Sequence, residues 1–112
     1  MPTFPFSILS PRGKACEGPA NSVSAPGALG GFGVLAGHAP MIAAVQAGLT
    51  TVVGEGQTTH YFTGEGVVEV TREETIMLVD EAEKVDSVEA AKALLQKRLD
   101  RLASGAVAKV MP

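Results

Sequence analysis

The chain has 112 residues, 46% of them hydrophobic and 19% charged, and a net charge of −3. This length is that of one domain with room for a short appendage. The lack of a basic cluster excludes the phosphate backbone of nucleic acid as a partner. An aromatic content of only 4%, without tryptophan, predicts a core of aliphatic side chains and methionine.

From Phe4 to about Val79, short apolar runs alternate with turn residues. Close, regular spacing of such turns is typical of an all-β sandwich or barrel. The clearest hairpin joins Val67–Thr71 to Thr75–Val79 through a polar turn. The other expected strands are Phe4–Leu9, Val23–Ala25, Phe32–Leu35, Met41–Val45, Leu49–Val53 and Thr58–Thr63.

Composition changes at Asp80, after which neither glycine nor proline occurs before Gly105. The residues between them favour a helix. Asp86 is the expected N-cap, Glu89 completes a capping box with it, and Gly105 supplies the C-cap. We therefore expect a helix of about 18 residues, some 27 Å long, followed by a loosely ordered tail at 106–112.

Apolar residues at steps of three and four predict one apolar stripe along this helix. The stripe consists of Val88, Ala91, Leu95, Leu99 and Leu102. Basic residues near its end, Arg98 among them, are expected to complement the helix dipole. The acidic residues of 73–83 are expected to form a solvated turn and a domain junction.

Candidate chemistry is sparse. Gly31–Ala36 fits a dinucleotide-binding pattern, but Gly37 and Pro40 would break the helix that such a site needs. The two histidines, His38 and His60, have no cysteine or carboxylate at metal-ligand spacing. We expect no catalytic residues, no metal and no cofactor, and therefore not an enzyme.

A single cysteine, Cys16, excludes an internal disulfide and is typical of a reducing compartment. We expect it to be a small residue in a strand. The N-terminus lacks the features of a signal peptide. No run approaches the ~18 apolar residues of a membrane span, so we expect a soluble chain that meets a membrane only through a partner.

The segment Ser22–Ile42 is crowded with glycines around an apolar run and a compact turn, Gly37–Pro40. Glycine lets a backbone approach another surface closely. The segment therefore predicts a binding surface and not a catalytic site.

Sequence blocks in this segment and beyond it resemble the epsilon subunit of F-type ATP synthases. The resemblance covers most of the chain, with its blocks in the family's order and spacing. The matching blocks are Ala25–Gly27, Phe32–Leu35, Gly37–Pro40, Gly66–Val70 and Leu78–Glu83.

The resemblance implies a mainly β fold: a flattened β-sandwich of about ten short strands over 1–84, then one helix and a short tail over 85–112. It implies a non-catalytic rotor subunit at the foot of the central stalk. Such a subunit binds the gamma subunit and the c-ring, and couples proton-driven rotation to ATP synthesis in the alpha/beta head. We accordingly expect a peripheral location on the cytoplasmic face of a bacterial inner membrane.

By the same resemblance, one stretch is expected at the interface with the c-ring and gamma. Its residues are Phe32, Gly33, Gly37, His38, Ala39 and Pro40. Gly31 stands where members often carry an acidic residue, so one charged contact is lost.

Some members bind ATP through a motif that this chain matches at Asp86 but not at Glu89, which stands in place of an arginine. A carboxylate there repels a triphosphate, so we expect weak or absent nucleotide binding.

The shortened helical region implies weak inhibition of ATP hydrolysis. An ATP-sensing regulatory β-sandwich module is the alternative function, and a free-standing β-sandwich adaptor is a further one.

Overall fold

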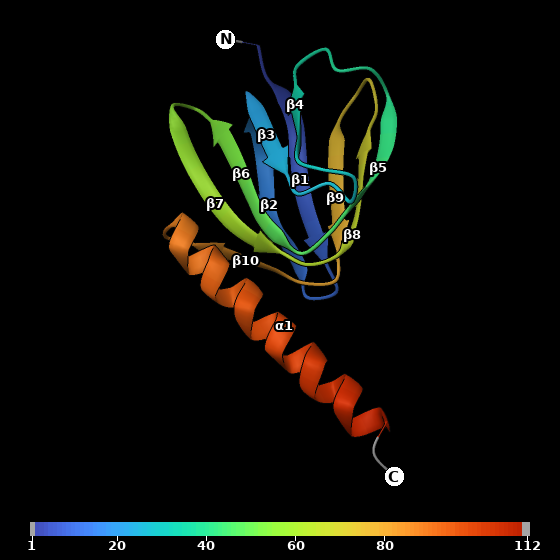
Figure 1. Ribbon diagram of the computed structural model, residues 1–112. Helices are drawn as coiled ribbons and strands as arrows, with labels where there is room; N and C mark the ends of the chain where they lie inside the picture. The colour runs from blue at the N-terminus through green and yellow to red at the C-terminus, as the bar shows by residue number, and fades with distance from the viewer. Residues whose placement is uncertain (1, 111–112) are drawn as a thin grey trace.

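The structure is a computed structural model that describes the backbone of residues 2–110 and the side chains of residues 2–104. These residues form ten strands and one C-terminal helix, α1, at Val88–Val110 (Figure 1). The strands are β1 Phe4–Ser10, β2 Gly13–Ala20, β3 Ser22–Ala25, β4 Phe32–Leu35, β5 Met41–Val45, β6 Gly48–Gly54, β7 Gln57–Thr63, β8 Gly66–Val70, β9 Thr75–Val79 and β10 Ala82–Val85.

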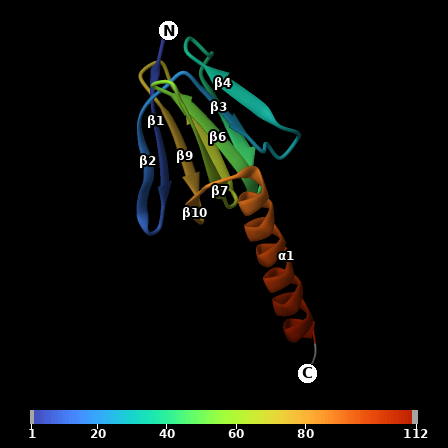
Figure 2. The same ribbon diagram turned by 90° about the vertical axis from the view of Figure 1, so that its left-hand side faces the viewer.

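The strands form two five-stranded sheets that pack face to face. Sheet A has the order β2-β1-β9-β8-β5, and sheet B has the order β10-β7-β6-β3-β4. Neighbouring strands are antiparallel except β1 and β9, which run parallel. Figure 2 shows the two layers from the side, with helix α1 on the outside of sheet B. The predicted β-sandwich followed by one helix is confirmed.

Alternating side chains of both sheets fill the space between them. In β8, Val68 and Val70 are buried whereas Val67 and Glu69 face outward, the pattern expected of a pleated strand. Phe6, Ile8 and Met77 are among the buried residues of sheet A. The core is therefore mostly aliphatic, as the composition predicts.

Two threonines are buried in this core, and their hydroxyl groups are hydrogen-bonded. The hydroxyl oxygens of Thr50 and Thr63 lie 2.8 Å apart across the β6–β7 pair, so each satisfies the other.

Helix α1 packs on the outer face of sheet B through its first three turns. Phe62 of β7 and Ala91 of the helix are both almost fully buried, and Leu94 and Leu95 pack against them. Beyond Arg98 the helix extends away from the sandwich (Figures 1 and 2). The second half of the predicted stripe therefore does not pack on the sandwich, since Leu99 is 50% and Leu102 55% exposed.

Both ends of the helix differ from the prediction. The N-cap is Ser87 and not Asp86, because the Ser87 hydroxyl accepts a hydrogen bond of 3.1 Å from the Ala90 N–H. Ala90 thus occupies the position that a capping box would give to Glu89. At the other end the helix continues through Gly105 to Val110, since an interior glycine costs only about 1 kcal/mol.

Two of the observed strands, β2 and β10, were not among those predicted from the sequence. β10 lies in the segment of helix-forming composition, but its residues pair with β7 from Ala82–Thr63 to Val85–His60. β2 contains Gly18 and Pro19 and stands at the edge of sheet A, where proline is tolerated because one side of the strand has no hydrogen-bonding neighbour.

Candidate functional site

The β4–β5 turn is tightly held by its own backbone. The His38 N–H donates to the Leu35 carbonyl at 3.1 Å, and Gly37 has φ +83°, which other residues rarely adopt. The His38 Nδ1 lies 2.7 Å from the Ala39 carbonyl oxygen, which can only accept. Nδ1 therefore donates this hydrogen bond, and Nε2 is left for a hydrogen bond with a partner.

A second segment, the β3–β4 loop at 26–31, lies at the other end of β4 and lines a common hollow with His38. It crosses from sheet B to the edge of sheet A, where the Ala28 N–H donates to Ala44 O at 3.0 Å and the Gln46 N–H to Pro26 O at 2.9 Å. These bonds place Leu29 next to β5. We call the β4–β5 turn, this loop and the adjoining part of β5 the turn end of the sandwich.

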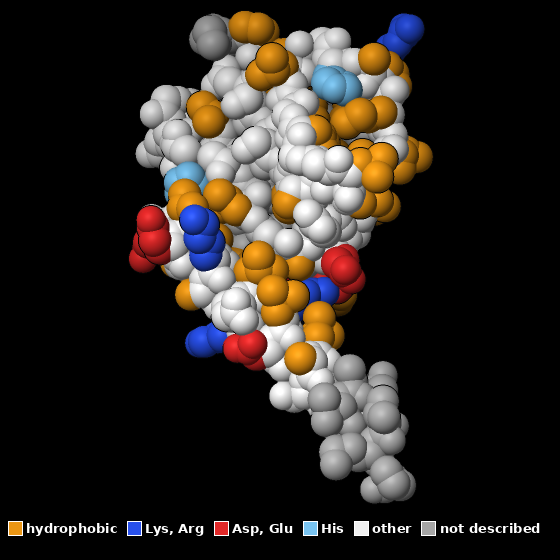
Figure 3. Space-filling view, viewed as in Figure 1, with side chains coloured by type: hydrophobic (Ala, Val, Ile, Leu, Met, Phe, Trp, Pro, Cys, Tyr) orange, Lys and Arg blue, Asp and Glu red, His pale blue; other side chains and the backbone are white. Residues whose placement is uncertain are grey.

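The turn end contains an apolar hollow of about 480 Å³ between the loop, His38 and residues 41–44 of β5. No Asp, Glu, Lys or Arg lines it in the described part of the chain. Leu29 is fully exposed at its rim and Ile42 is 71% exposed. Figure 3 shows hydrophobic side chains gathered on this side of the molecule, over β5.

The predicted interface residues lie at this end but in different hollows. Phe32 and His38 line the larger hollow. Gly37, Ala39 and Pro40 line a second hollow, of about 240 Å³, between the turn and the start of the β8–β9 connection, and His38 lines this hollow as well. Gly33 lies apart from both, in a shallow depression on the outer face of sheet B. Leu29 and Ile42 are the residues that the sequence prediction missed.

At the opposite end, charged residues join the helix to the sandwich. The Arg98 side chain is only 8% exposed, and its guanidinium donates to Asp80 Oδ2 at 2.8 Å and to Glu81 Oε2 at 3.0 Å. Glu65 lies 3.8 Å away. Asp80 and Glu81 therefore lie at the predicted junction and stay about half exposed. The predicted dipole role of Arg98 is wrong, because Arg98 lies in the middle of a helix that runs to Val110 and faces the sandwich.

Gly64 makes this ion pair possible. A Cβ at this position would collide with the Asp80 carboxylate and would lie 2.9 Å from Arg98 Nη1. The glycine in the β7–β8 connection therefore leaves the space in which Asp80 and Arg98 meet.

The ion pair shifts the acid–base equilibria of its members. The hydrogen bond from Arg98 lowers the pKa of Asp80 below its ordinary 3.8, although partial burial opposes this. The same hydrogen bond raises the pKa of Arg98. A depressed pKa in the folded state means that the unfolded state binds more protons between the two values, so stability falls as the pH falls through that range.

We expect the free energy of unfolding to decrease below about pH 4 more steeply in the wild type than in Asp80→Asn. Above pH 4 the wild type should be the more stable of the two, because only the carboxylate pairs with Arg98. Urea unfolding from pH 3 to pH 7 measures both curves. Parallel curves would show that Asp80 and Arg98 do not interact.

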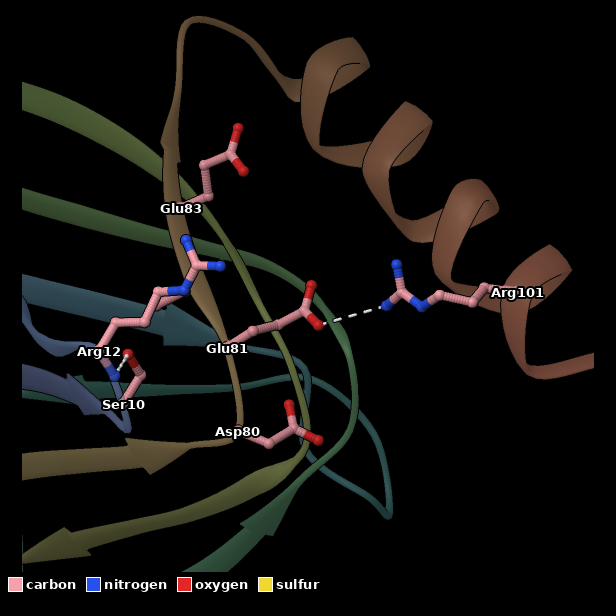
Figure 4. A pocket seen from close by; sticks show the side chains of 7 residues that line it. Ser10, Arg12, Asp80, Glu81, Glu83 and Arg101 are labelled. Carbon is pink, nitrogen blue, oxygen red and sulfur yellow. Dashed lines mark hydrogen bonds and ion pairs between the residues drawn. The ribbon is translucent and has the colours of Figure 1, made fainter. Parts of the chain in front are cut away.

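The surface around this ion pair is unsuited to phosphate. Asp80, Glu81 and Glu83 line a hollow of about 400 Å³ with Arg12 and Arg101. Figure 4 shows Arg101 reaching from the helix to Glu81, a contact of 3.4 Å. Arg98 bonds two of these three carboxylates, so the charges balance and the hollow offers no net positive charge to a phosphate.

The two residues of the doubtful nucleotide motif lie elsewhere. Asp86 is exposed just before the helix, and Glu89 is exposed in its first turn. Neither lines the charged hollow.

The remaining candidates are structural. Cys16 of β2 is a half-buried free thiol that packs against the core. Burial and a hydrogen bond with Cys16 raise the pKa of Tyr61. The Thr51 hydroxyl oxygen and His60 Nδ1 lie 3.1 Å apart and form a hydrogen bond.

Within the described residues, no group of three or more His, Cys, Asp or Glu is placed to hold a metal. No helix among them is long and apolar enough to cross a membrane.

Comparison with known proteins identifies relatives over most of the chain. The ATP synthase epsilon chain of Nitrobacter winogradskyi is 37% identical over 91 residues, which are 81% of this chain and 67% of the relative. The epsilon chain of Helicobacter pylori is 37% identical over an alignment of 120 residues that covers 98% of each chain. The chain thus spans about two thirds of the first relative and nearly all of the second.

Solved structures show the same fold. A chain of the Euglena gracilis mitochondrial ATP synthase, solved as an OSCP/F1/c-ring assembly, matches with a TM-score of 0.69 at 22% identity, over 87% of this chain and 64% of that chain. A chain of the Tetrahymena thermophila mitochondrial ATP synthase central stalk and c-ring matches with a TM-score of 0.62 at 9% identity, over 89% and 91%. The family model for the ATP synthase delta/epsilon chain, beta-sandwich domain, matches residues 3–85. The protein therefore belongs to the delta/epsilon chain family of ATP synthases.

Proposed function

We propose that this chain is a non-catalytic rotor subunit of an F-type ATP synthase, which binds the gamma subunit and the c-ring and couples proton-driven rotation to ATP synthesis. Its relatives carry the name epsilon chain. The observation that carries the proposal is the turn end: an apolar hollow with exposed leucine and isoleucine at its rim beside a rigid turn. Such exposed apolar surface is typical of protein interfaces.

Within this function, the turn end contacts the c-ring. Its backbone is fixed by the hydrogen bonds of the β3–β4 loop and the β4–β5 turn, so little conformational entropy is lost on binding. His38 Nε2 offers one hydrogen-bonding atom, and Leu29 offers an apolar contact. A rigid surface is also what transmission of torque requires. The chain then lies at the cytoplasmic face of a bacterial inner membrane, held there by the complex.

We expect Leu29→Asp and His38→Ala to reduce proton-driven ATP synthesis several-fold in a reconstituted enzyme. Both side chains point away from the core, so the variants should fold normally and still bind gamma. Lys92→Ala, on the exposed face of the helix, is the matched control and should leave the rate unchanged. If both turn-end variants synthesise ATP at the wild-type rate, the turn end does not take part in coupling.

We further propose that the chain binds nucleotide weakly or not at all. The hollow beside Arg101 offers no net positive charge, and the carboxylate of Glu89 opposes a triphosphate. Calorimetric titration with MgATP should show no heat of binding at micromolar concentrations. Micromolar binding would instead support the ATP-sensing regulatory module.

Inhibition of ATP hydrolysis is expected to be weak as well. In reconstituted enzyme, deletion of the residues after Val85 should then change the hydrolysis rate by less than about twofold. A large increase on deletion would show that the helix inhibits.

A further inference from the structure

We infer that the apolar hollow at the turn end receives an apolar side chain from a loop of the c-ring, in a contact that contains no ion pair. The inference rests on the proposed function, in which the c-ring is the partner of the turn end, and it specifies the chemistry of the partner surface. The residue that enters the hollow is aliphatic or aromatic, and no charged group of the ring lies within the contact. Leu29 is the matching anchor on this chain.

Leu29 stands at the tip of a tight turn that holds it out into solvent. Its side chain is fully exposed, and a hydrogen bond of 3.1 Å from the Gly30 N–H to the Gly27 carbonyl closes the turn. A Cβ on Gly27 would collide with the Gly30 carbonyl oxygen and would lie 2.7 Å from the Phe32 ring, which itself packs against the core. Gly27 and Phe32 are therefore positioning residues that fix where Leu29 stands. A fixed anchor loses little conformational entropy on binding.

Apolar side chains bound the hollow on both sides. Phe32 lines it from the loop, and Met41 and Ile42 line it from β5. Ile42 is 71% exposed, so an inserted side chain would cover much apolar surface, and this burial supplies the attraction. The thioether side chain of Met41 is flexible and adapts to the shape of what it contacts.

The hollow rejects charged groups. Among the described residues that line it, only His38 can carry a charge, whereas Arg72 and Glu74 line the second hollow on the other side of the turn. A lysine, arginine or carboxylate that entered the apolar hollow would lose its water without gaining an ionic partner, which is strongly unfavourable. The hollow therefore selects a partner surface by excluding charge as well as by apolar contact.

Charges near the turn end disfavour a membrane surface as the occupant. Arg72, Glu73 and Glu74 lie in the connection between β8 and β9, which borders the second hollow, and their net charge is negative. An anionic lipid surface repels such a connection. His38 lines both hollows, so the apolar hollow is continuous with the turn at Gly37–Pro40. The c-ring, which has this turn as its proposed contact, is therefore the favoured occupant.

The test is the binding of the complex of the full chain and its cognate gamma subunit to the cognate c-ring in dodecylmaltoside, measured by biolayer interferometry at 50 mM NaCl. Leu29→Asp should weaken binding roughly tenfold or more. Leu29→Met keeps an apolar anchor and should retain most of the affinity. Both variants should bind gamma as the wild type does, which shows that they are folded.

A pair of variants at Gly31 isolates the effect of charge. Gly31 lines the hollow, and a Cβ there would approach the Ala25 carbonyl oxygen to only 3.8 Å, so a longer side chain fits. Gly31→Glu should bind the ring roughly tenfold more weakly than Gly31→Gln, because the two side chains differ little except in charge. Gln57→Glu adds the same charge at an exposed position of β7 outside the hollow and should stay within about twofold of the wild type.

The outcomes separate this inference from the rotor function. If Gly31→Glu binds the ring more tightly than Gly31→Gln, the ring presents a basic residue here and the inference is wrong. If the wild type binds the ring and the Leu29 and Gly31 variants bind equally well, the inference fails and the rotor function stands. If the wild-type complex does not bind the ring, the rotor function itself fails.

Two further results would assign the hollow to another occupant and overturn the inference. One is a dimer of the free chain in sedimentation velocity that Leu29→Asp dissociates. The other is binding of the free chain to phosphatidylglycerol vesicles that Leu29→Asp abolishes.

Discussion

Replacing Phe62 by alanine is expected to lower the free energy of unfolding by about 3–5 kcal/mol and to release helix α1 from the sandwich. Phe62 is 2% exposed and forms, with Val85 and Ala91, the buried centre of the contact between helix and sheet B. Alanine would leave a cavity that the rigid sheet cannot close. Urea denaturation measures the loss of stability, and hydrogen exchange of the helix amides measures its release.

Leu102→Ala is the matched control, since it also truncates a large apolar residue. Leu102 is 55% exposed on the projecting part of the helix, so its effect should stay within about 0.5 kcal/mol. Equal losses for the two variants would mean that the whole apolar stripe packs on the sandwich.

Replacing Arg98 by alanine should cost about 2 kcal/mol and should loosen the helix beyond Leu95. The nearly buried guanidinium bonds two carboxylates, and such charge-assisted bonds are strong. Because Asp80 is itself 51% exposed, water recovers part of this energy. Arg98→Lys should restore only part of the stability, because an ammonium cannot reproduce the planar two-nitrogen contact.

Arg101→Ala provides the comparison for Arg98. Its side chain is 63% exposed and makes one contact of 3.4 Å, so the change should be within about 0.5 kcal/mol. If the Arg98 and Arg101 variants lose the same stability, the contribution of the arginines is a general charge effect and not a specific anchor.

Much of the fold could be predicted from local pattern. The hairpin at Val67–Val79 and the Phe32–Leu35 strand match observed strands, because alternating or continuous apolar runs bounded by glycine have few other stable arrangements. β10 was not predictable in this way. Its residues form a strand only because β7 offers them an open edge, and tertiary pairing overrides local propensity.

The role of Arg98 was hidden for a similar reason. In sequence it is one of several basic residues near a helix end, and nothing local shows that it faces Asp80 and Glu81. Only its position on the same side of the helix as Ala91 and Leu94 indicates that it meets the sandwich.

The candidate site was partly predictable. Glycine and proline at 37–40 indicated the turn, but the exposure of Leu29 and Ile42 depends on the β3–β4 loop crossing between the sheets. Likewise, the order of sheet A requires the pairing of β1 with β9, which lie far apart in the chain. Sequence periodicity gives the face of each strand but not its neighbours.

The most direct test of the rotor function is the mass of the complex formed when the purified chain is mixed with its cognate gamma subunit, measured by size-exclusion chromatography with light scattering. The proposed function predicts one complex with one copy of each chain. Separate elution of the two proteins at micromolar concentrations would contradict it.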